Sequence, residues 1–332
     1  MKFSIVTPAY NADRYVGEMI ASVRRQSLYD WELRIVDDGS TDGTRSIIER
    51  EAMTDPRIKP IYLDENSGSD FLPRRIAIEQ SEGEYVVNID ADDTVEKDYL
   101  YKLDDRIRNT GADIVYADMY LTGLDKDPFK AFPRAEEDIY HDVYDGMALM
   151  NMALDEWRIS GVSATRKALA LKSLELYDYE MASEPYWNSF DNENLTRMDL
   201  AMAEKVAFSN ARYFYRQVPD SVTHKMSERR FGLLSADIRL CEFTEKYFGR
   251  GSKEDILANR QLLHHVVEFM RILNSPSDLR PSRQARILTS KAYRRIDLQT
   301  VKGAVSPRFW KLMHLGFPLS KLILKMYEKR DG

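Results

Sequence analysis

The feature that most constrains the fold is an alternation of strand and helix patterns between residues 3 and 117. Short runs rich in β-branched and aromatic residues alternate with segments whose apolar residues recur at helical spacing. The predicted strands are 3–7, 31–36, 58–63, 84–89 and 113–117, and the predicted helices lie at 13–26, around 47–48, at 71–82 and at 97–108. This order predicts an α/β domain with a mostly parallel, Rossmann-like sheet flanked by helices.

Polar residues follow three of these strands. They lie at 7–10, where Pro8 is expected to break the first strand, at 37–42, and at 90–93. Because ligands of such sheets bind at the carboxyl ends of the strands, we expect these segments to meet at one functional edge. The first strand lacks the Gly-x-Gly-x-x-Gly of dinucleotide-binding domains, and no P-loop motif occurs, so both of those classes are disfavoured.

Three carboxylates stand at the end of the fourth strand, where Asp90, Asp92 and Asp93 surround Ala91. Neighbouring carboxylates repel one another and lose hydration when they are buried, and a divalent cation relieves both costs. Hard oxygen ligands favour Mg²⁺ or Mn²⁺, bound by one or two carboxylates together with substrate phosphates. The segment therefore predicts a metal–diphosphate site. The alternative is a solvated acidic turn.

Composition and charge bound the remaining possibilities. The chain has 332 residues and one cysteine, Cys241, so an internal disulfide framework is excluded. No signal peptide or run of 18 apolar residues is visible, and we expect a cytoplasmic protein. Residues 280–332 carry 13 Lys and Arg against 3 Asp and Glu, although the whole chain has a net charge of −6. A basic end on an acidic body indicates an anionic partner, for which a membrane is favoured over nucleic acid.

The motifs themselves resemble those of a known family. Ser-Ile-Val-Thr-Pro-Ala-Tyr-Asn at 4–11, Val-Asp-Asp-Gly-Ser-Thr-Asp at 36–42, and the segment from Gly83 through Asp90-Ala91-Asp92-Asp93 are similar to family 2 glycosyltransferases of the GT-A fold. The resemblance covers roughly residues 1–225 and is strongest over 1–110. It implies a GT-A catalytic domain at 1–225, a helical region at 226–332, and transfer of a sugar from a nucleotide diphosphate sugar with inversion.

The resemblance also implies roles for individual residues on the donor side. The first-strand motif would contact the nucleotide, Asp38 would accept a hydrogen bond from the uracil imide, and Arg74 would contact the base or a phosphate. For Asp38 the alternative is capping of the next helix, and the segment around Arg74 departs from the commoner family pattern. The implied donor-binding residues are Thr7, Pro8, Ala9, Tyr10, Asp38, Arg74, Asp90, Ala91 and Asp92, with Asp92, Asp90 and His224 as metal contacts.

Inversion by direct displacement needs a general base on the acceptor side. The family's base motif corresponds here to residues 191–197, at the start of a predicted helix that reaches about 204, and Glu193 is the best match with Asp191 as the alternative. Relatives often have paired carboxylates at this motif, whereas here Asn192 and Asn194 flank Glu193. The structural alternative is a carboxylate that complements the helix dipole. Tyr186 and Trp187, just before the motif, would form either a sugar-stacking platform or plain core.

The last third of the chain reads as helices at 231–248, 254–273, 281–297 and 306–328. The final helix is amphipathic, rich in lysine and carries Trp310, which suits a membrane interface, although an ordinary packing helix is equally expected. We therefore interpret the chain as an inverting, Mn²⁺- or Mg²⁺-dependent glycosyltransferase. Its donor would be a UDP-sugar and its acceptor a glycan or lipid-linked hydroxyl in bacterial surface polysaccharide synthesis. The alternatives are a catalytically impaired sugar-nucleotide-binding module and, less favoured, a sugar nucleotidyltransferase.

Overall fold

The computed structural model describes residues 1–123, 128–133, 139–155, 161–177, 191–217, 228–274, 282–302, 310–311 and 313–318. The chain divides into two compact units, one formed by 1–178 with 191–219 and the other by 179–190 with 220–332. Among the described residues, no helix combines the length and apolar character needed to cross a membrane.

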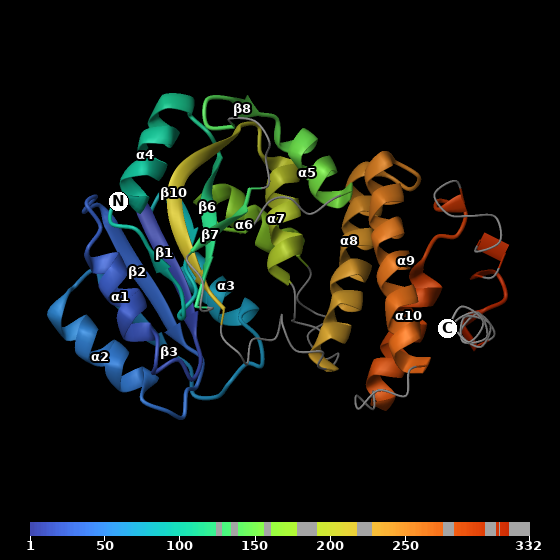
Figure 1. Cartoon of the computed structure of the whole chain (residues 1–332), viewed down its shortest axis with the longest axis horizontal. Coiled ribbons are helices and arrows are strands. Elements are labelled where there is room, and N and C mark those ends of the chain that lie inside the picture. The colour runs from blue at the N-terminus through green and yellow to red at the C-terminus, as the bar shows by residue number, and fades with distance from the viewer. Residues whose placement is uncertain are drawn as a thin grey trace. The chain divides into compact units, whose positions relative to one another are not determined.

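A mixed β-sheet forms the centre of the first unit (Figure 1). Its strands run in the order β3-β2-β1-β4-β9-β6-β10-β5, with β7 paired to β6 and β8 to β10. Their bounds are β1 Phe3–Ala9, β2 Trp31–Asp37, β3 Ile58–Tyr62, β4 Tyr85–Asn88, β5 Thr94–Val95, β6 Ile114–Thr122, β7 Phe129–Phe132, β8 Val143–Tyr144, β9 Ser163–Arg166 and β10 Val206–Arg216.

The predicted α/β class is confirmed, but the sheet is less parallel than expected. Strands β3, β2, β1 and β4 are mutually parallel, as are β6 and β10, whereas β9 runs antiparallel to both β4 and β6. The predicted break at Pro8 is wrong, because β1 continues to Ala9 with Pro8 opposite Val36. Proline removes one backbone donor, but its fixed φ is compatible with the end of a strand.

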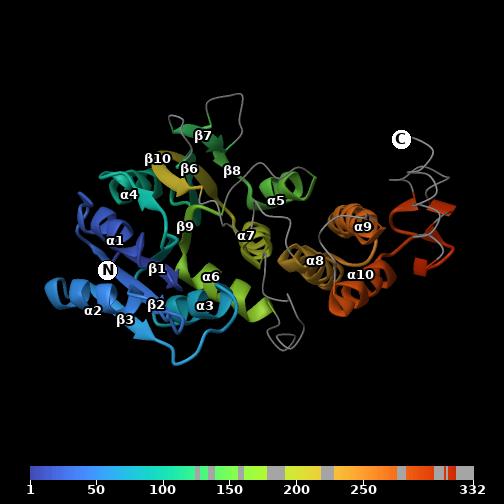
Figure 2. The same ribbon diagram turned by 60° about the horizontal axis from the view of Figure 1, so that its bottom comes forward.

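Helices cover both faces of this sheet. Helices α1 Val16–Arg24, α2 Thr44–Thr54 and α4 Tyr99–Thr110 lie on one side, and α3 Phe71–Glu79 and α6 Lys167–Leu176 lie side by side on the other (Figure 2). Helix α7 Asp191–Met202 packs against α6 and against α5 Gly146–Asp155. The helices predicted at 13–26, 71–82 and 97–108 are therefore confirmed, with ends that differ by a few residues.

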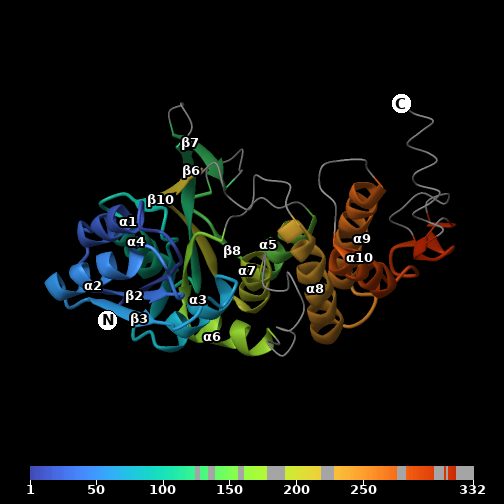
Figure 3. The ribbon, with the colours of Figure 1, turned by 90° about the horizontal axis from the view of Figure 1, so that it is seen from below.

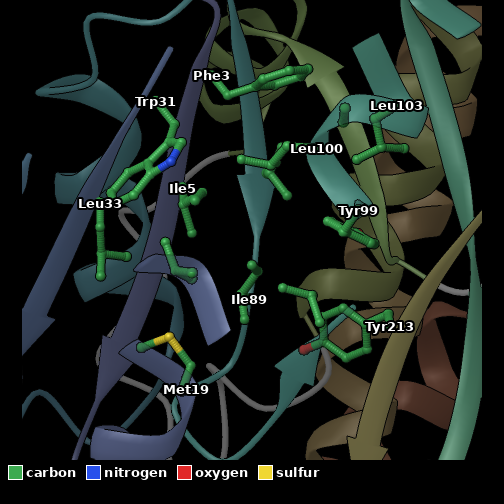
Figure 4. Packing of buried hydrophobic residues seen from close by; sticks show 14 of the residues in the cluster. Phe3, Ile5, Met19, Trp31, Leu33, Ile89, Tyr99, Leu100, Leu103 and Tyr213 are labelled. Carbon is green, nitrogen blue, oxygen red and sulfur yellow. The ribbon is translucent and has the colours of Figure 1, made fainter. Parts of the chain in front are cut away.

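The main hydrophobic cluster lies between the sheet and the first set of helices. Phe3 and Ile5 of β1 point to this side, together with Met19 of α1 and Leu100 and Leu103 of α4 (Figure 4). Phe3 and Ile5 share one face because alternate residues of a strand project to the same side. Removing such a side chain from water stabilises the fold by about 1.5–3 kcal/mol, so this cluster fixes the strands whose ends carry the polar segments.

The second unit is helical over the residues that the structure describes. Helices α8 Gly232–Phe248, α9 Lys253–Asn274 and α10 Arg283–Arg295 lie side by side, after a short 3-10 turn η2 Glu228–Phe231 (Figure 3). The rings of Phe231 and Phe269 pack with centroids 4.5 Å apart, and Cys241 is a buried free thiol. The first three predicted C-terminal helices are thus confirmed, while most of the one predicted at 306–328 lies outside the described residues.

Candidate active site

The carboxyl ends of β1, β2 and β4 meet at one edge of the sheet. The Thr7 hydroxyl donates a hydrogen bond of 2.8 Å to the Ile89 carbonyl, just beyond β4. The backbone N–H of Asp38, just beyond β2, donates to the Ala9 carbonyl at 2.8 Å. The expected convergence of the three polar segments therefore occurs, and it is held by hydrogen bonds as well as by the sheet.

The loop after β1 is bound to the loop after β2. Asn11 has a φ of 47°, in the left-handed region, and its side-chain oxygen accepts a hydrogen bond from the Thr41 N–H at 2.9 Å. Its own N–H donates to the Ser40 hydroxyl at 3.0 Å. Tyr10, immediately before it, remains 49% exposed. The first-strand motif therefore presents an accessible aromatic ring beside a rigid turn.

Asp38 is buried and engaged by one residue. Its two carboxylate oxygens accept hydrogen bonds from the Ser67 N–H at 3.0 Å and the Ser67 hydroxyl at 2.9 Å. Burial raises the pKa of this carboxyl, and the bonds from Ser67 oppose that rise. Asp38 does not cap α2, because the first free N–H of that helix, on Thr44, is bound by Asp42 at 2.9 Å. Each oxygen of Asp38 retains a second acceptor position for a ligand.

Gly39 explains why a glycine follows this aspartate. Its φ is +67°, and a Cβ there would lie 2.6 Å from the Glu65 carbonyl carbon. Any side chain would therefore displace the segment that carries Ser67. The Asp-Gly pair is fixed by this close approach of two backbones.

The three carboxylates after β4 have different environments. The Asp90 side chain is 44% exposed, whereas Asp93 is 1% exposed and accepts hydrogen bonds from the Tyr213 hydroxyl at 2.6 Å and the Arg216 N–H at 2.7 Å. Burial, followed by repulsion from Asp90, raises the pKa of Asp92 to about 6. The segment is therefore not a plain solvated turn, and Asp93 anchors it to β10.

Asp90 and Asp92 fit a divalent cation with incomplete protein coordination. Within the described part of the chain there is no group of three or more His, Cys, Asp or Glu side chains placed to hold a metal ion. Mg²⁺ and Mn²⁺ sites that also use substrate phosphates need only one or two carboxylates. Burial is the larger cause of the raised pKa of Asp92 and repulsion from Asp90 the smaller one, and a nearby cation would oppose both by favouring the ionised carboxylate. The third expected metal contact, His224, lies outside the described residues.

Arg74 lies beside this pair, buried on α3 with 4% exposure. One guanidinium nitrogen, Nη2, is 3.0 Å from Asp90 Oδ1 and 3.0 Å from Asp70 Oδ2. Burial lowers the pKa of Arg74, but Asp90 and Asp70 outweigh it and raise the pKa above the usual value. Its Nε is buried and has no hydrogen-bond partner among the residues that the structure describes. A donor thus remains available next to the carboxylates.

Helix α7 begins at Asp191 and carries the predicted base motif. The Glu193 side chain is 40% exposed and lies 3.6 Å from Arg197 Nη1, one turn along. Asn192 points elsewhere, because its Nδ2 donates to Asp70 Oδ2 at 2.8 Å. The side chain of Asp191, and the positions of Tyr186 and Trp187, lie outside what the structure describes.

A cavity of about 190 Å³ opens between β4 and α7. Arg74, Asn88, Asp90, Asn192 and Asp199 are among its lining residues, and Glu193 is not. Asn88 Oδ1 is buried there, and no described residue forms a hydrogen bond with it. Burial raises the pKa of Asp199 to about 7, although its carboxylate accepts a hydrogen bond from the Ser173 hydroxyl.

Sequence patterns did not single out several residues of this site. Asp70 and Asp199 belong to no motif, and Asn88 lies inside the fourth-strand motif without a predicted role. The contacts of Asp70 and Asp199 join separate helices. Tyr213 and Arg216 lie on β10, a strand that the sequence analysis did not predict. Their contacts with the turn after β4 span 120 and 123 residues, and no local pattern reports such a distance.

Comparison with known proteins adds a family and a fold. A family model described as "Glycosyl transferase family 2" matches residues 4–170. TuaG of Bacillus subtilis, a glycosyltransferase whose name links it to teichuronic acid biosynthesis, is 38% identical over 139 residues. That match covers 42% of this chain and 55% of TuaG, so the chain spans about half the length of this relative.

Solved structures agree on the fold. The structure of Staphylococcus aureus TarS residues 1–349 in complex with UDP-GlcNAc matches with a TM-score of 0.74 and 19% identity, and the match covers 99% of this chain and 91% of that one. The mannosyltransferase PcManGT from Pyrobaculum calidifontis, solved with GDP-Man and Mn²⁺, matches with a TM-score of 0.52 and 18% identity, over 98% of this chain and 86% of that one. At this level of identity the likeness establishes the GT-A fold alone.

Proposed function

The chain belongs to glycosyl transferase family 2, and from this premise we propose that it is an inverting, metal-dependent glycosyltransferase. Its donor is a nucleotide diphosphate sugar with uridine as the base, and its acceptor is a hydroxyl of a glycan or lipid-linked glycan. The observation that carries the proposal is the junction of the β1, β2 and β4 ends. It brings Asp38, Arg74 and the Asp90–Asp92 pair to one edge of the sheet.

The cellular setting follows from the relatives. TuaG is named for teichuronic acid biosynthesis and TarS is named as a poly(ribitol-phosphate) β-N-acetylglucosaminyltransferase. Both names concern polymers of the bacterial envelope. We propose a related role for this chain, in the synthesis of a bacterial surface polysaccharide.

On the donor side, three residues contact the nucleotide and two more hold the metal. The exposed Tyr10 ring packs against the base. Asp38 accepts a hydrogen bond from the imide N–H of uracil at its remaining acceptor positions. The unpartnered Nε of Arg74 donates to the base or to a phosphate oxygen. Mn²⁺ or Mg²⁺, held by Asp92 and Asp90, would supply positive charge for the departing diphosphate.

On the acceptor side, Glu193 acts as general base. It takes the proton of the acceptor hydroxyl as that oxygen forms a bond to the anomeric carbon. The bond from this carbon to the diphosphate oxygen breaks at the same time, and its electron pair leaves with the nucleoside diphosphate. Asp191 is the alternative base, at the first residue of the same helix.

A two-part experiment tests this function. Thermal unfolding is measured with UDP, GDP, CDP and ADP, each with and without Mn²⁺, since a bound ligand raises stability by mass action. Hydrolysis of the matching nucleotide sugar is then measured with the same protein. We expect Mn²⁺-dependent stabilisation by UDP followed by release of UDP from a UDP-sugar. Stabilisation without hydrolysis or transfer would instead identify a sugar-nucleotide-binding module.

We also propose a division of labour along the chain. Residues 1–225 form the catalytic domain, and the basic, helical residues 226–332 bring the enzyme to the cytoplasmic face of an anionic membrane. The support is the charge of residues 280–332 and the amphipathic sequence from 306 onward. The liposome experiment described below tests this proposal.

A further inference from the structure

Asp70 does not act as its position in the sequence suggests. It is the N-cap residue of α3, where an aspartate ordinarily accepts a hydrogen bond from a backbone N–H of its own helix. Here the side chain makes no such bond. Its Oδ2 instead accepts from Arg74 Nη2 at 3.0 Å and from Asn192 Nδ2 at 2.8 Å. One carboxylate oxygen therefore joins the donor edge to the first turn of α7.

This contact accounts for an unusual residue in the base motif. A carboxylate at position 192 would place two like charges within 3 Å of each other, because the partner atom is an oxygen of Asp70. An asparagine supplies a donor to that oxygen and adds no charge. Asn192 therefore fits the structure as one half of a hydrogen bond, and it is not evidence of a decayed site.

The contact forms part of a continuous polar path. Asp90 and Asp70 both accept hydrogen bonds from the same nitrogen of the buried Arg74. Asp70 also accepts a hydrogen bond from Asn192. Glu193 is the next residue of α7. The hydrogen bond from Asn192 restrains the first turn of α7, and the same turn carries Glu193.

We propose that Asp70 is a positioning residue. Through its hydrogen bond with Asn192 it holds the first turn of α7 at a fixed distance from the donor edge, and this turn carries the base Glu193. The proposal rests on the proposed function for its catalytic meaning. The structural part, that Asp70 and Asn192 hold the start of α7, can be tested without any activity.

The structural part is tested with a double-mutant cycle on thermal unfolding and with amide hydrogen exchange. The variants are Asp70→Asn, Asn192→Asp and the swap that combines both, in which an asparagine at 70 donates to an aspartate at 192. Asn192→Asp should destabilise the protein and speed exchange in the first turn of α7, and the swap should reverse both effects. Additive effects and unchanged exchange would overturn the proposal.

The catalytic part is tested by steady-state kinetics on the same set. Misplacing a catalytic group by about 1 Å costs up to about 10²-fold in rate. We therefore expect Asn192→Asp to lower kcat for transfer about 10- to 100-fold at pH 8 with little change in the KM for donor. The swap should recover at least about tenfold of that loss.

Glu79→Gln is the matched control. It removes a carboxylate from the same helix, where Glu79 pairs with Arg75 at 2.8 Å on an exposed face, and it should leave transfer unchanged. The positioning role would be contradicted if the Asp70→Asn, Asn192→Asp double variant transferred sugar no faster than Asn192→Asp. An equal loss of UDP–Mn²⁺ affinity in all variants would also contradict it. If the parent transfers no sugar, the proposed function fails, and the unfolding cycle still decides the contact.

Discussion

The donor edge and the acceptor side of the first unit are built in different ways. The donor edge comes from residues 3–93, where each strand follows its helix closely and neighbouring strands run parallel. The acceptor side combines β9, α6 and α7 with the end of β10, which follow one another over residues 163–216 and pack against β4 and α3 from a much earlier part of the chain. Its first strand, β9, is antiparallel to both neighbours.

The difference separates two tasks. At the donor edge, the Asp38 N–H and the Thr7 hydroxyl join the strand ends by hydrogen bonds that need no ligand. A cavity lies between the two regions, and within the described part of the chain the buried Asn88 Oδ1 that lines it has no hydrogen-bond partner. The side chains of Asp70 and Asn192 also join the two regions. Binding of the nucleotide should therefore depend on the first region, and transfer should depend on both.

The largest expected effect is on the donor edge. Asp92→Asn should abolish metal-dependent turnover and the Mn²⁺-dependent part of UDP affinity, because the amide removes the anionic ligand. Calorimetric titration of UDP with and without Mn²⁺ measures this directly. Parental affinity for UDP and Mn²⁺ in the variant would contradict the assignment of Asp92.

The second largest effect should be on the rate of sugar transfer, and it should distinguish the acceptor side from the donor edge. Glu193→Gln should lower transfer by about 10²- to 10⁴-fold, the usual contribution of a general base. UDP affinity should stay unchanged, because the donor edge lies on other elements. Asp191→Asn, assayed beside it with the same acceptor, should do much less. An inactive Asp191→Asn with an active Glu193→Gln would move the base to the alternative residue.

A third effect concerns stability on the acceptor side. Burial raises the pKa of Asp199 to about 7, so the folded protein keeps this proton between about pH 4 and 7 while the unfolded chain loses it. The contribution of Asp199 to stability therefore falls as pH rises through this range and is lowest above pH 7. Asp199→Asn removes that penalty, by an amount on the order of 1 kcal/mol or more.

Thermal unfolding of the parent and Asp199→Asn at several pH values checks this. The melting temperature of the variant relative to the parent should be higher at pH 7.5 than at pH 4.5. A difference independent of pH would mean that Asp199 is ionised in the folded protein at every pH tested. The donor edge should not respond, so UDP affinity serves as the control.

The smallest effect should involve neither region. Deletion of residues 306–332 should weaken binding to anionic liposomes, because it removes a basic amphipathic sequence, and should leave donor hydrolysis intact. Neutral liposomes are the control for charge. Equal binding of both forms to anionic liposomes would end the membrane proposal, and an insoluble truncation would favour an ordinary packing helix.

The two regions also differ in how well the sequence predicts them. The strands, helices and strand ends of residues 3–117 follow from local periodicity, and the structure brings Asp38 and Asp90 to the expected edge. Only small errors occur there, such as the passage of β1 through Pro8. Local rules suffice for most of these elements because β1 pairs with β2 and β2 with β3, in each case the next strand along the chain, whereas the pairing of β1 with β4 joins distant segments.

The acceptor side was predicted less completely for the same physical reason. The start of α7 was identified, but the link from Asn192 to Asp70 spans 122 residues and depends on the packing of two helices. The buried state of Asp199 arises in the same way, from the contact of α6 with α7. Propensity and spacing contain no information about such contacts until the chain is folded.

The anchoring of the turn after β4 has a consequence for the order in which the protein is made. Arg216 donates from its backbone to Asp93 and from its Nε to the Asp92 carbonyl, which lies 124 residues earlier. A ribosome completes the carboxylate turn long before it reaches this arginine. The nascent chain can therefore form its first four strands early, yet it gains a fixed turn only when β10 emerges.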